Sequence, residues 1–195
     1  MVDAVILAAG YSSRANGFKM EFEIEGKAVL SYVIEAFLPI CENVFVVGGY
    51  QSDKLTPLIK PYGDKVKLII NENYEKGMFS SVKTGVKFVV SEQFFITPGD
   101  YPFITTSICN SLLKANKAFV IPSFNKRGGH PLLLSHSCIE ELLSESDEGN
   151  LKDFLKRLPV EYVNLLDDGI MYDLDTPEDY YMLQKRMKEK IDRRE

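Results

Sequence analysis

The chain has 195 residues, of which 45% are hydrophobic and 26% are charged, and its formal net charge is −5 at pH 7. Length and composition are typical of a globular protein with a sizeable core, so we expect a single domain over residues 1–195. The acidic balance argues against a nucleic acid or an anionic membrane as partner, because both require a basic footprint.

Three cysteines, Cys41, Cys109 and Cys138, are spread along the chain without a C-x-x-C pair. This spacing argues against a zinc ribbon or a thioredoxin-like motif, and a low, odd count fits a reducing compartment. We expect all three to be small buried hydrophobic residues. Asp3 interrupts the first apolar run, and no basic segment precedes it, so no signal peptide is indicated. Since no apolar stretch approaches the length of a membrane span, we expect a cytoplasmic protein.

Apolar runs alternate with helix-like patterns along the chain, which predicts a single-domain α/β fold with a mostly parallel twisted sheet flanked by helices. Strands are predicted for a first run from Val5 and for residues 43–48, 66–70, 93–97, 118–121, 131–134 and 160–165. Helices are predicted for residues 29–37, 79–90, 107–115, 137–143 and 151–158, and from Pro177 onward. We expect residues 123–129 to form an active-site loop or a turn, and the charged tail 185–195 to fray.

The first apolar run ends in a loop of small residues that carries two cations. It reads Val5-Ile6-Leu7-Ala8-Ala9-Gly10-Tyr11-Ser12-Ser13-Arg14, and Lys19 follows. Small residues let backbone N–H groups approach a ligand, and with Arg14 and Lys19 they would cradle a polyphosphate at the carboxyl end of a strand. The spacing matches neither the P-loop nor G-x-G-x-x-G. The alternative is an ordinary strand-to-helix turn with two surface cations.

The second motif, Thr97-Pro98-Gly99-Asp100-Tyr101-Pro102, follows another predicted strand. It therefore brings a carboxylate to the same edge of the sheet as the first loop. A hard oxygen ligand at that place suits Mg²⁺ bound to substrate phosphates. The alternative is a β-turn, because proline, glycine and aspartate all favour turns.

The third motif, Tyr172-Asp173-Leu174-Asp175-Thr176-Pro177-Glu178-Asp179, stands near the end of the chain. A period of two places Asp173 and Asp175 on one face of an extended segment. Thr176 could cap the helix that Pro177 begins. A simple helix start is the alternative, but it needs only one of these residues and leaves Asp173 and Asp175 unexplained.

Two further motifs lie in the middle of the chain. Residues 71–85, with Gly77, Met78, Ser80 and Ser81, would present backbone N–H groups and hydroxyls at a helix N-terminus, suited to the base or ribose of a nucleotide; a capped helix is the alternative. In residues 127–134, His130 could contact the phosphate of a second substrate, or could simply pack.

Together these motifs resemble the MobA-like nucleotidyltransferase family. The first is similar to its L-A-[AG]-G-x-S-x-R-M-G-x-x-K pattern, although Ala15 and Asn16 replace Met-Gly. The others are similar to its G-D-x-P, D-x-D-T-P-E-D and N-x-x-x-x-x-G-M-x-S-S elements, and to the G-H-P-x-L-L of its cytidylyltransferase branch. The resemblance covers nearly the whole chain in the right order.

The resemblance implies a Rossmann-like fold of the nucleotide-diphospho-sugar transferase type and a set of site residues. Nucleotide binding would fall to Leu7, Ala8, Ala9, Gly10, Ser12, Arg14, Lys19, Gly77, Met78, Ser80, Ser81 and Gly99. Arg14, Lys19 and Asp100 would be catalytic, and His130 would contact the acceptor. Mg²⁺ would be held by Asp100 and Asp175, with Asp173 as a further candidate ligand.

The branch that this chain resembles most transfers CMP from CTP to the molybdopterin cofactor, releases pyrophosphate, and could pass its product to a molybdoenzyme. A phosphomonoester acceptor has a second pKa of about 6, so no general base is required. Ala9 stands where guanylyltransferase relatives more often carry glycine, and its methyl would favour a pyrimidine base. The alternatives are the same fold acting with GTP or on another phosphorylated acceptor, and a non-catalytic carrier of the molybdenum cofactor.

Overall fold

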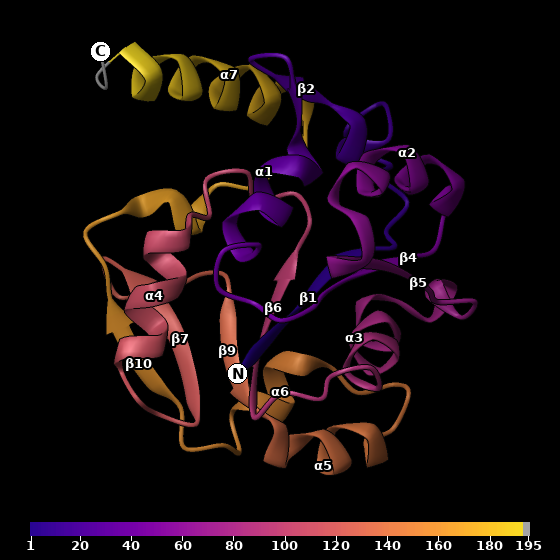
Figure 1. Ribbon diagram of the computed structural model, residues 1–195, viewed down its shortest axis with the longest axis vertical. Coiled ribbons are helices and arrows are strands. Elements are labelled where there is room, and N and C mark those ends of the chain that lie inside the picture. The colour runs from indigo at the N-terminus through magenta and orange to yellow at the C-terminus, as the bar shows by residue number, and fades with distance from the viewer. Residues whose placement is uncertain (193–195) are drawn as a thin grey trace.

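A mostly parallel sheet runs through the protein, with helices on both faces (Figure 1). The computed structural model describes residues 1–192. Its strands are β1 (Val2–Ala8), β4 (Val44–Gly48), β5 (Val66–Ile70), β6 (Gln93–Pro98), β7 (Phe119–Phe124), β8 (Arg127–Gly128), β9 (Leu132–Ser135) and β10 (Glu161–Asn164). They lie in the order β10-β7-β9-β6-β1-β4-β5, and β8 pairs with β7. A small separate hairpin joins β2 (Glu23–Ile24) to β3 (Lys27–Ala28).

The predicted mostly parallel sheet is confirmed, and two of its strands, β8 and β9, run antiparallel to their neighbours. Strand β1 is central and pairs in parallel with β4 and β6, and all seven of its residues are buried because both faces are covered. Strand β9 runs antiparallel to both of its neighbours, β6 and β7. Its direction could not be read from the sequence, since an apolar run looks the same in either orientation.

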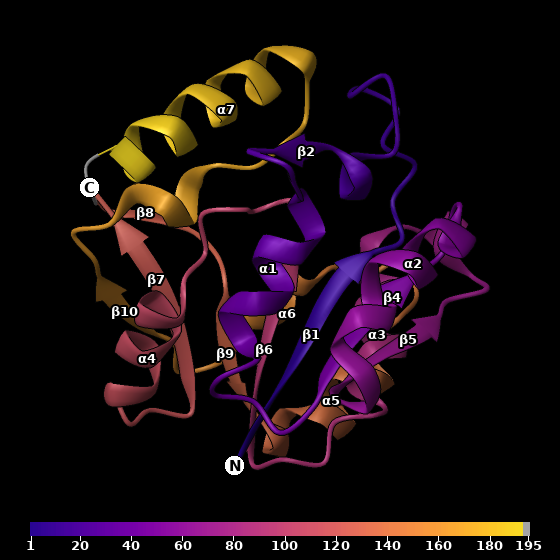
Figure 2. The ribbon, with the colours of Figure 1, turned by 45° about the horizontal axis from the view of Figure 1, so that its top comes forward.

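The helices form two layers (Figure 2). Helices α1 (Val29–Phe37), α2 (Leu55–Ile59) and α4 (Thr106–Lys114) cover one face of the sheet. Helices α3 (Met78–Val86), α5 (Ile139–Ser144) and α6 (Leu151–Leu155) cover the other. The last helix, α7 (Pro177–Asp192), lies beside the β2–β3 hairpin. Short 3₁₀ turns span Lys19–Glu21, Ser52–Lys54, Lys60–Lys65, Tyr74–Lys76, His136–Cys138 and Asp168–Met171.

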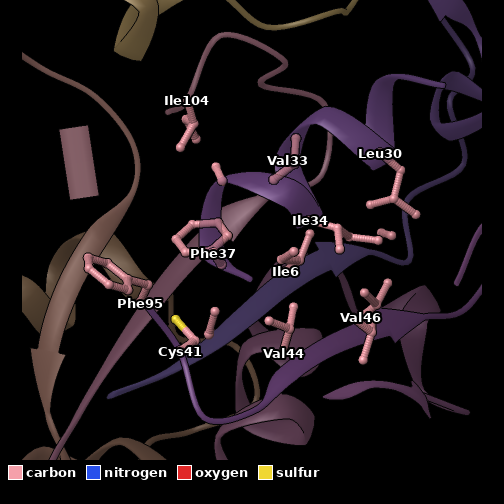
Figure 3. Close-up of a cluster of buried hydrophobic side chains, with 14 of the residues drawn as sticks. Ile6, Leu30, Val33, Ile34, Phe37, Cys41, Val44, Val46, Phe95 and Ile104 are labelled. Atoms are coloured by element: carbon pink, nitrogen blue, oxygen red, sulfur yellow. The ribbon is translucent and has the colours of Figure 1, made fainter. Parts of the chain in front are cut away.

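Alternation along β1 divides the core between the two faces of the sheet. Ile6 packs with Ile34 and Phe37 of α1 on one side (Figure 3), whereas Val5 packs with Val82 of α3 on the other. All three cysteines are free and buried, which confirms that they behave as small hydrophobic residues. Among residues 1–192, no helix combines the length and the apolar character that crossing a membrane requires.

The buried carboxylate of Asp3 ends helix α3 earlier than predicted. The backbone N–H groups of Val90 and Ser91 each donate to Asp3 Oδ2 at 3.0 Å, and Asn43 donates to Oδ1. Burial raises the pKa of Asp3, but these hydrogen bonds outweigh burial and lower it below its ordinary value. The chain therefore leaves the helix after Val86, so that Val90 and Ser91 reach this carboxylate.

Other predicted elements differ at their ends. Helix α6 ends at Leu155, where a turn replaces the last residues of the predicted helix. Residues 123–129 form a turn, as one of the two expectations held: β7 and β8 pair across Asn125 and Lys126, whose φ angles are 48° and 65°.

The prediction that the tail frays is wrong for residues 185–192, which continue α7. Leu183 and Met187 are buried against Phe103 and Leu174, and Arg186 pairs with Asp168. These contacts hold the helix where the charge pattern alone indicates fraying. The remaining residues of the predicted tail, 193–195, lie outside the described residues.

Candidate active site

Three segments distant in sequence meet at the carboxyl ends of β1 and β6. The Gly99 N–H donates to the carbonyl of Leu7 at 2.8 Å, which joins the end of β6 to the end of β1. The Leu174 N–H donates to the carbonyl of Asp100 at 3.0 Å, which brings the segment before α7 to the same place. Parallel strands end at one edge, so the expected meeting of the first loop with Asp100 is realised.

At this edge, a single ammonium group links two carboxylates. Lys19 Nζ lies 2.7 Å from Asp100 Oδ2 and 2.7 Å from Asp175 Oδ1. The side chains of Lys19 and Asp100 are only 14% and 12% exposed. Arg14 approaches Asp175 Oδ2 at 2.7 Å from the solvent side, with a side chain that is 72% exposed. Lys19 is therefore the inner cation of the site and Arg14 is the cation at its rim.

The pKa values of the site follow from this placement. Burial raises the pKa of Asp100, and the neighbouring Lys19 only partly offsets it. Burial lowers the pKa of Lys19, but the two carboxylates outweigh burial and raise it, so the ammonium stays charged. The hydrogen bond from Lys19 holds the pKa of Asp175 below its ordinary value despite partial burial, and Arg14 adds to the effect.

The donor set fits a hard divalent cation. Asp100 Oδ1 is buried and has no hydrogen-bond partner among the described residues, so a lone pair is left for a ligand. Asp100 and Asp175 already share one cation, whereas that cation does not contact Asp173. Residues 1–192 hold no group of three or more His, Cys, Asp or Glu side chains arranged around a common metal position. A metal would thus take two carboxylates here and complete its shell with water and phosphate, as Mg²⁺ does.

A cavity of about 290 Å³ opens beside these charges. Most of the predicted nucleotide-binding residues line it: Leu7, Ala8, Ala9, Gly10, Ser12, Lys19, Gly77, Met78 and Ser81, with Asp100. Arg14, Ser80 and Gly99 are not in its wall. The Ser80 hydroxyl instead donates to the carbonyls of Gly77 and Asn73, at 2.8 and 2.9 Å, and so shapes the turn that carries Gly77.

Sequence reasoning missed the aromatic and acidic part of this wall. Tyr11 packs against Tyr50 with a tilted ring and against Tyr74 edge-on, with centroids 5.2 and 5.6 Å apart, and Tyr74 and Glu75 line the cavity. Asn71 was seen only as part of a motif, yet its buried side chain donates to Ser80 Oγ and Ser81 Oγ. The available signals were the positions of Tyr11 inside the first loop and of Tyr74 and Glu75 inside the motif at residues 71–85.

A second cavity of about 810 Å³ adjoins the first. Met78 lines both cavities, and Tyr101 of the second follows Asp100 of the first. Its remaining wall is mainly aliphatic, with Ile121, Leu132, Leu151, Leu155, Leu158, Val160 and Ile170, and Lys152 and Lys156 also line it. The larger cavity therefore offers an apolar surface next to the charged cluster.

His130 lies in this second cavity, where its ring meets Tyr101 edge-on with centroids 5.0 Å apart. Burial lowers the pKa of His130 to about 4, so the imidazole is neutral at neutral pH. Its Nδ1 atom is buried and unpaired among the described residues. Burial and the charges of Asp173, Asp100 and Asp175 raise the pKa of Tyr101, so its phenol keeps its proton.

Comparison with known proteins shows which family this chain resembles. The model of the MobA-like NTP transferase domain matches residues 4–162. The molybdenum cofactor cytidylyltransferase of Escherichia coli is 30% identical over 189 residues, covering 96% of this chain and 98% of the relative. A probable molybdenum cofactor guanylyltransferase of Natranaerobius thermophilus is 25% identical, over 94% of this chain and 95% of the relative.

Solved structures share the fold. A nucleotidyl transferase from Methanothermobacter superposes with a TM-score of 0.84 at 17% identity, covering 97% of this chain and 99% of that one. A manganese complex of Rv0371c from Mycobacterium tuberculosis superposes with a TM-score of 0.75 at 18% identity, covering 94% and 98%. At such low identity, these two likenesses establish the arrangement of strands and helices only.

Proposed function

Because the chain belongs to the MobA-like NTP transferase family and is a nucleotidyltransferase, we propose that it transfers CMP from CTP to the molybdopterin cofactor and releases pyrophosphate. The observation that carries this proposal is the pair of adjoining cavities. One is lined by the small-residue loop and Lys19, the other is larger and mainly aliphatic, and Asp100 and Tyr101 stand at their junction. Two substrates would therefore meet beside the charged cluster.

The smaller cavity suits the nucleotide. The backbone of Ala9 and Gly10 would face the phosphates, and Lys19 and Arg14 would neutralise their charge. A Cβ added to Gly49 would come within 2.9 Å of the Ala9 methyl and 2.6 Å of Tyr74 Cβ, so these three residues are tightly packed. This packing supports a narrow base site and hence a pyrimidine, in line with the 30% identical cytidylyltransferase.

Asp100 and Asp175 would hold Mg²⁺, which when bound polarises the phosphate oxygens and offsets their charge. The unpaired oxygen of Asp100 and the shared cation position support this assignment. A solved structure of the same fold contains manganese, a cation of similar oxygen preference.

The larger cavity suits the acceptor. Its aliphatic wall would cover a flat heterocyclic body, whereas the hydroxyls of a sugar phosphate would be left unpaired against it at a cost of about 1–3 kcal/mol each. The acceptor phosphate would lie at the end formed by Tyr101 and His130, nearest to Asp100. There the Tyr101 hydroxyl would donate a hydrogen bond to it, and the neutral His130 would orient it without adding charge.

The chemistry then depends on positioning and charge. An ionised oxygen of the acceptor phosphate forms a bond to the α-phosphorus of CTP, and the bond from that phosphorus to the bridging oxygen of pyrophosphate breaks. Lys19 and Arg14 stabilise the charge that grows on the departing pyrophosphate. Because the acceptor oxygen is already ionised at neutral pH, no side chain has to remove a proton.

The test is a transfer assay with purified protein, Mg²⁺ and each of CTP, GTP, ATP and UTP, with and without molybdopterin cofactor. We expect pyrophosphate release that requires both CTP and the cofactor, and a cytosine dinucleotide product in the mass spectrum. Pyrophosphate release with GTP but with none of the other nucleotides would assign the protein to the guanylyltransferase branch. Cofactor binding without pyrophosphate release from any nucleotide would indicate a carrier and overturn the proposal.

A further inference from the structure

The inner cation of the site occupies the place that a bridging metal would need. Lys19 Nζ lies 2.7 Å from one oxygen of Asp100 and 2.7 Å from one oxygen of Asp175. An ammonium group at that distance makes two charge-assisted hydrogen bonds. A divalent ion that bridged the same oxygens would lie between them, at about 2.0–2.1 Å from each for Mg²⁺. The two cations cannot hold that position together.

The backbone of Lys19 is fixed, so only its side chain can leave. Phe18 and Met20 on either side are each 5% exposed, and the Lys19 N–H faces Ser12 Oγ at 3.4 Å. Lys19 lines the smaller cavity, where the nucleotide phosphates would enter. The ammonium can therefore exchange carboxylate partners for phosphate partners without any movement of the fold.

We propose that Lys19 competes with the divalent metal for Asp100 and Asp175, and that nucleotide phosphates withdraw it, so that metal and nucleotide bind with positive cooperativity. This inference rests on the proposed function, in which these two carboxylates hold the metal. By linkage, whatever draws Lys19 off the carboxylates raises the affinity for metal, and the metal raises the affinity for that anion equally. The two carboxylates are thereby neutralised in either arrangement, by Lys19 before the nucleotide binds and by the metal afterwards.

The experiment measures the binding of Mn²⁺ alone, without nucleotide, by the electron paramagnetic resonance signal of the free ion. Wild type is compared with Lys19→Met, which keeps the length of the side chain, and with Lys19→Gln, which keeps a hydrogen-bond donor. We expect both variants to bind Mn²⁺ more tightly, by between about 5-fold and about 150-fold. Adding Asp100→Asn to Lys19→Gln should abolish the gain, which assigns it to this site.

Arg14→Met is the matched control. Like the Lys19 variants, Arg14→Met removes one positive charge and a 2.7 Å contact to Asp175, but the Arg14 side chain is exposed. We expect it to change Mn²⁺ affinity by no more than about twofold, because exposed ion pairs are weak. Equal affinities for wild type and both Lys19 variants would overturn the inference, as would an equal gain in Arg14→Met.

A second measurement separates this inference from the function on which it rests. The melting temperature of wild type is compared with that of Asp100→Asn in CTP, with and without Mn²⁺. If Mn²⁺ raises the melting temperature only in wild type, the metal site at Asp100 is supported. Unchanged Mn²⁺ affinity in the Lys19 variants would then overturn the competition between Lys19 and the metal, but not the metal site itself. If Mn²⁺ has no effect that depends on Asp100, the metal site itself is wrong, and both proposals fall.

Discussion

Asp100 and Tyr101 are neighbours in the chain but line different cavities. Asp100 lines the smaller one and pairs with Lys19, whereas Tyr101 lines the larger one and packs against His130. One peptide unit at the end of β6 therefore separates the proposed nucleotide site from the proposed acceptor site. A displacement of this unit would move both substrates relative to each other, which makes its side chains informative targets for mutation.

Tyr101→Phe should weaken the use of the acceptor but not of CTP. The substitution removes only the hydroxyl, whose pKa is raised by burial and nearby carboxylates, and one hydrogen bond is worth about 0.5–1.5 kcal/mol. We expect the KM for the acceptor to rise by about 2- to 12-fold while the KM for CTP stays constant. Tyr162→Phe, in the same cavity but 61% exposed, is the control that should change neither constant. An equal rise in both KM values would contradict the placement of the acceptor.

Arg14→Ala should lose activity without losing stability. Its side chain is 72% exposed, so we expect the free energy of unfolding to change by no more than about 0.5 kcal/mol. Loss of one charge contact to the transition state should lower kcat by about a hundredfold. Steady-state kinetics and urea unfolding measure the two effects. Lys117→Ala, which removes an exposed cation before β7 at the opposite end of the sheet, should leave both values unchanged. Normal turnover in Arg14→Ala would exclude this residue from catalysis.

Ala9→Gly should shift the choice of base toward GTP. The Ala9 methyl packs by Gly49 and Tyr74 at the wall of the smaller cavity, and its removal widens that wall. One methyl group in a packed site is worth about 1–3 kcal/mol, so the ratio of kcat/KM for CTP to that for GTP should fall by about tenfold or more. Ala4→Gly makes the same chemical change earlier in β1, where the methyl is buried in the core on the α1 face and does not line this cavity, and should leave the ratio intact. An unchanged ratio in Ala9→Gly would remove Ala9 from base selection.

His130 should make stability depend on pH. Burial lowers the pKa of His130 in the folded protein to about 4, from its ordinary value of 6.5. Between these values the unfolded chain binds a proton that the folded protein does not, so stability is constant above about pH 6.5 and falls as pH decreases toward 4. The loss should reach about 3 kcal/mol.

Urea unfolding at several pH values checks this prediction. His130→Gln, which cannot bind that proton, should show a shallower decline than wild type over this range. His136→Gln, at an exposed position, serves as the control and should follow wild type. Parallel curves for wild type and His130→Gln would show that His130 is accessible to protons in the folded state.

Much of the site followed from the chain because it depends on local rules. A run of small residues after a strand, and a carboxylate after a parallel strand, must meet at one edge of the sheet, and Lys19 and Asp100 do so. The sequence also predicts that Thr176 caps the helix that Pro177 begins, and the Thr176 hydroxyl accepts a hydrogen bond from the Asp179 N–H at 3.2 Å. The first contact follows from the common edge at which parallel strands end, although the two residues are 81 apart in sequence, and the second follows from residues three apart.

Contacts between distant residues could not be read in this way. Lys19 reaches Asp175 across a sequence separation of 156 residues, and nothing in either motif indicates that one ammonium group serves two carboxylates. The same limit hid the end of α3, which depends on Asp3 at the start of the chain. The larger cavity was missed because its wall is ordinary aliphatic sequence, drawn from β7, β9 and α6.

The position of Asp175 has a consequence for biosynthesis. The first loop and Asp100 are made early, but the segment that carries Asp175 is held by α7, through Arg186 on Asp168 and through Leu183 and Met187 beside Leu174. A nascent chain in which every strand of the sheet has been synthesised still lacks these contacts from α7. The charged cluster can therefore be completed only after α7 has been synthesised, which comes later in the chain than every strand of the sheet.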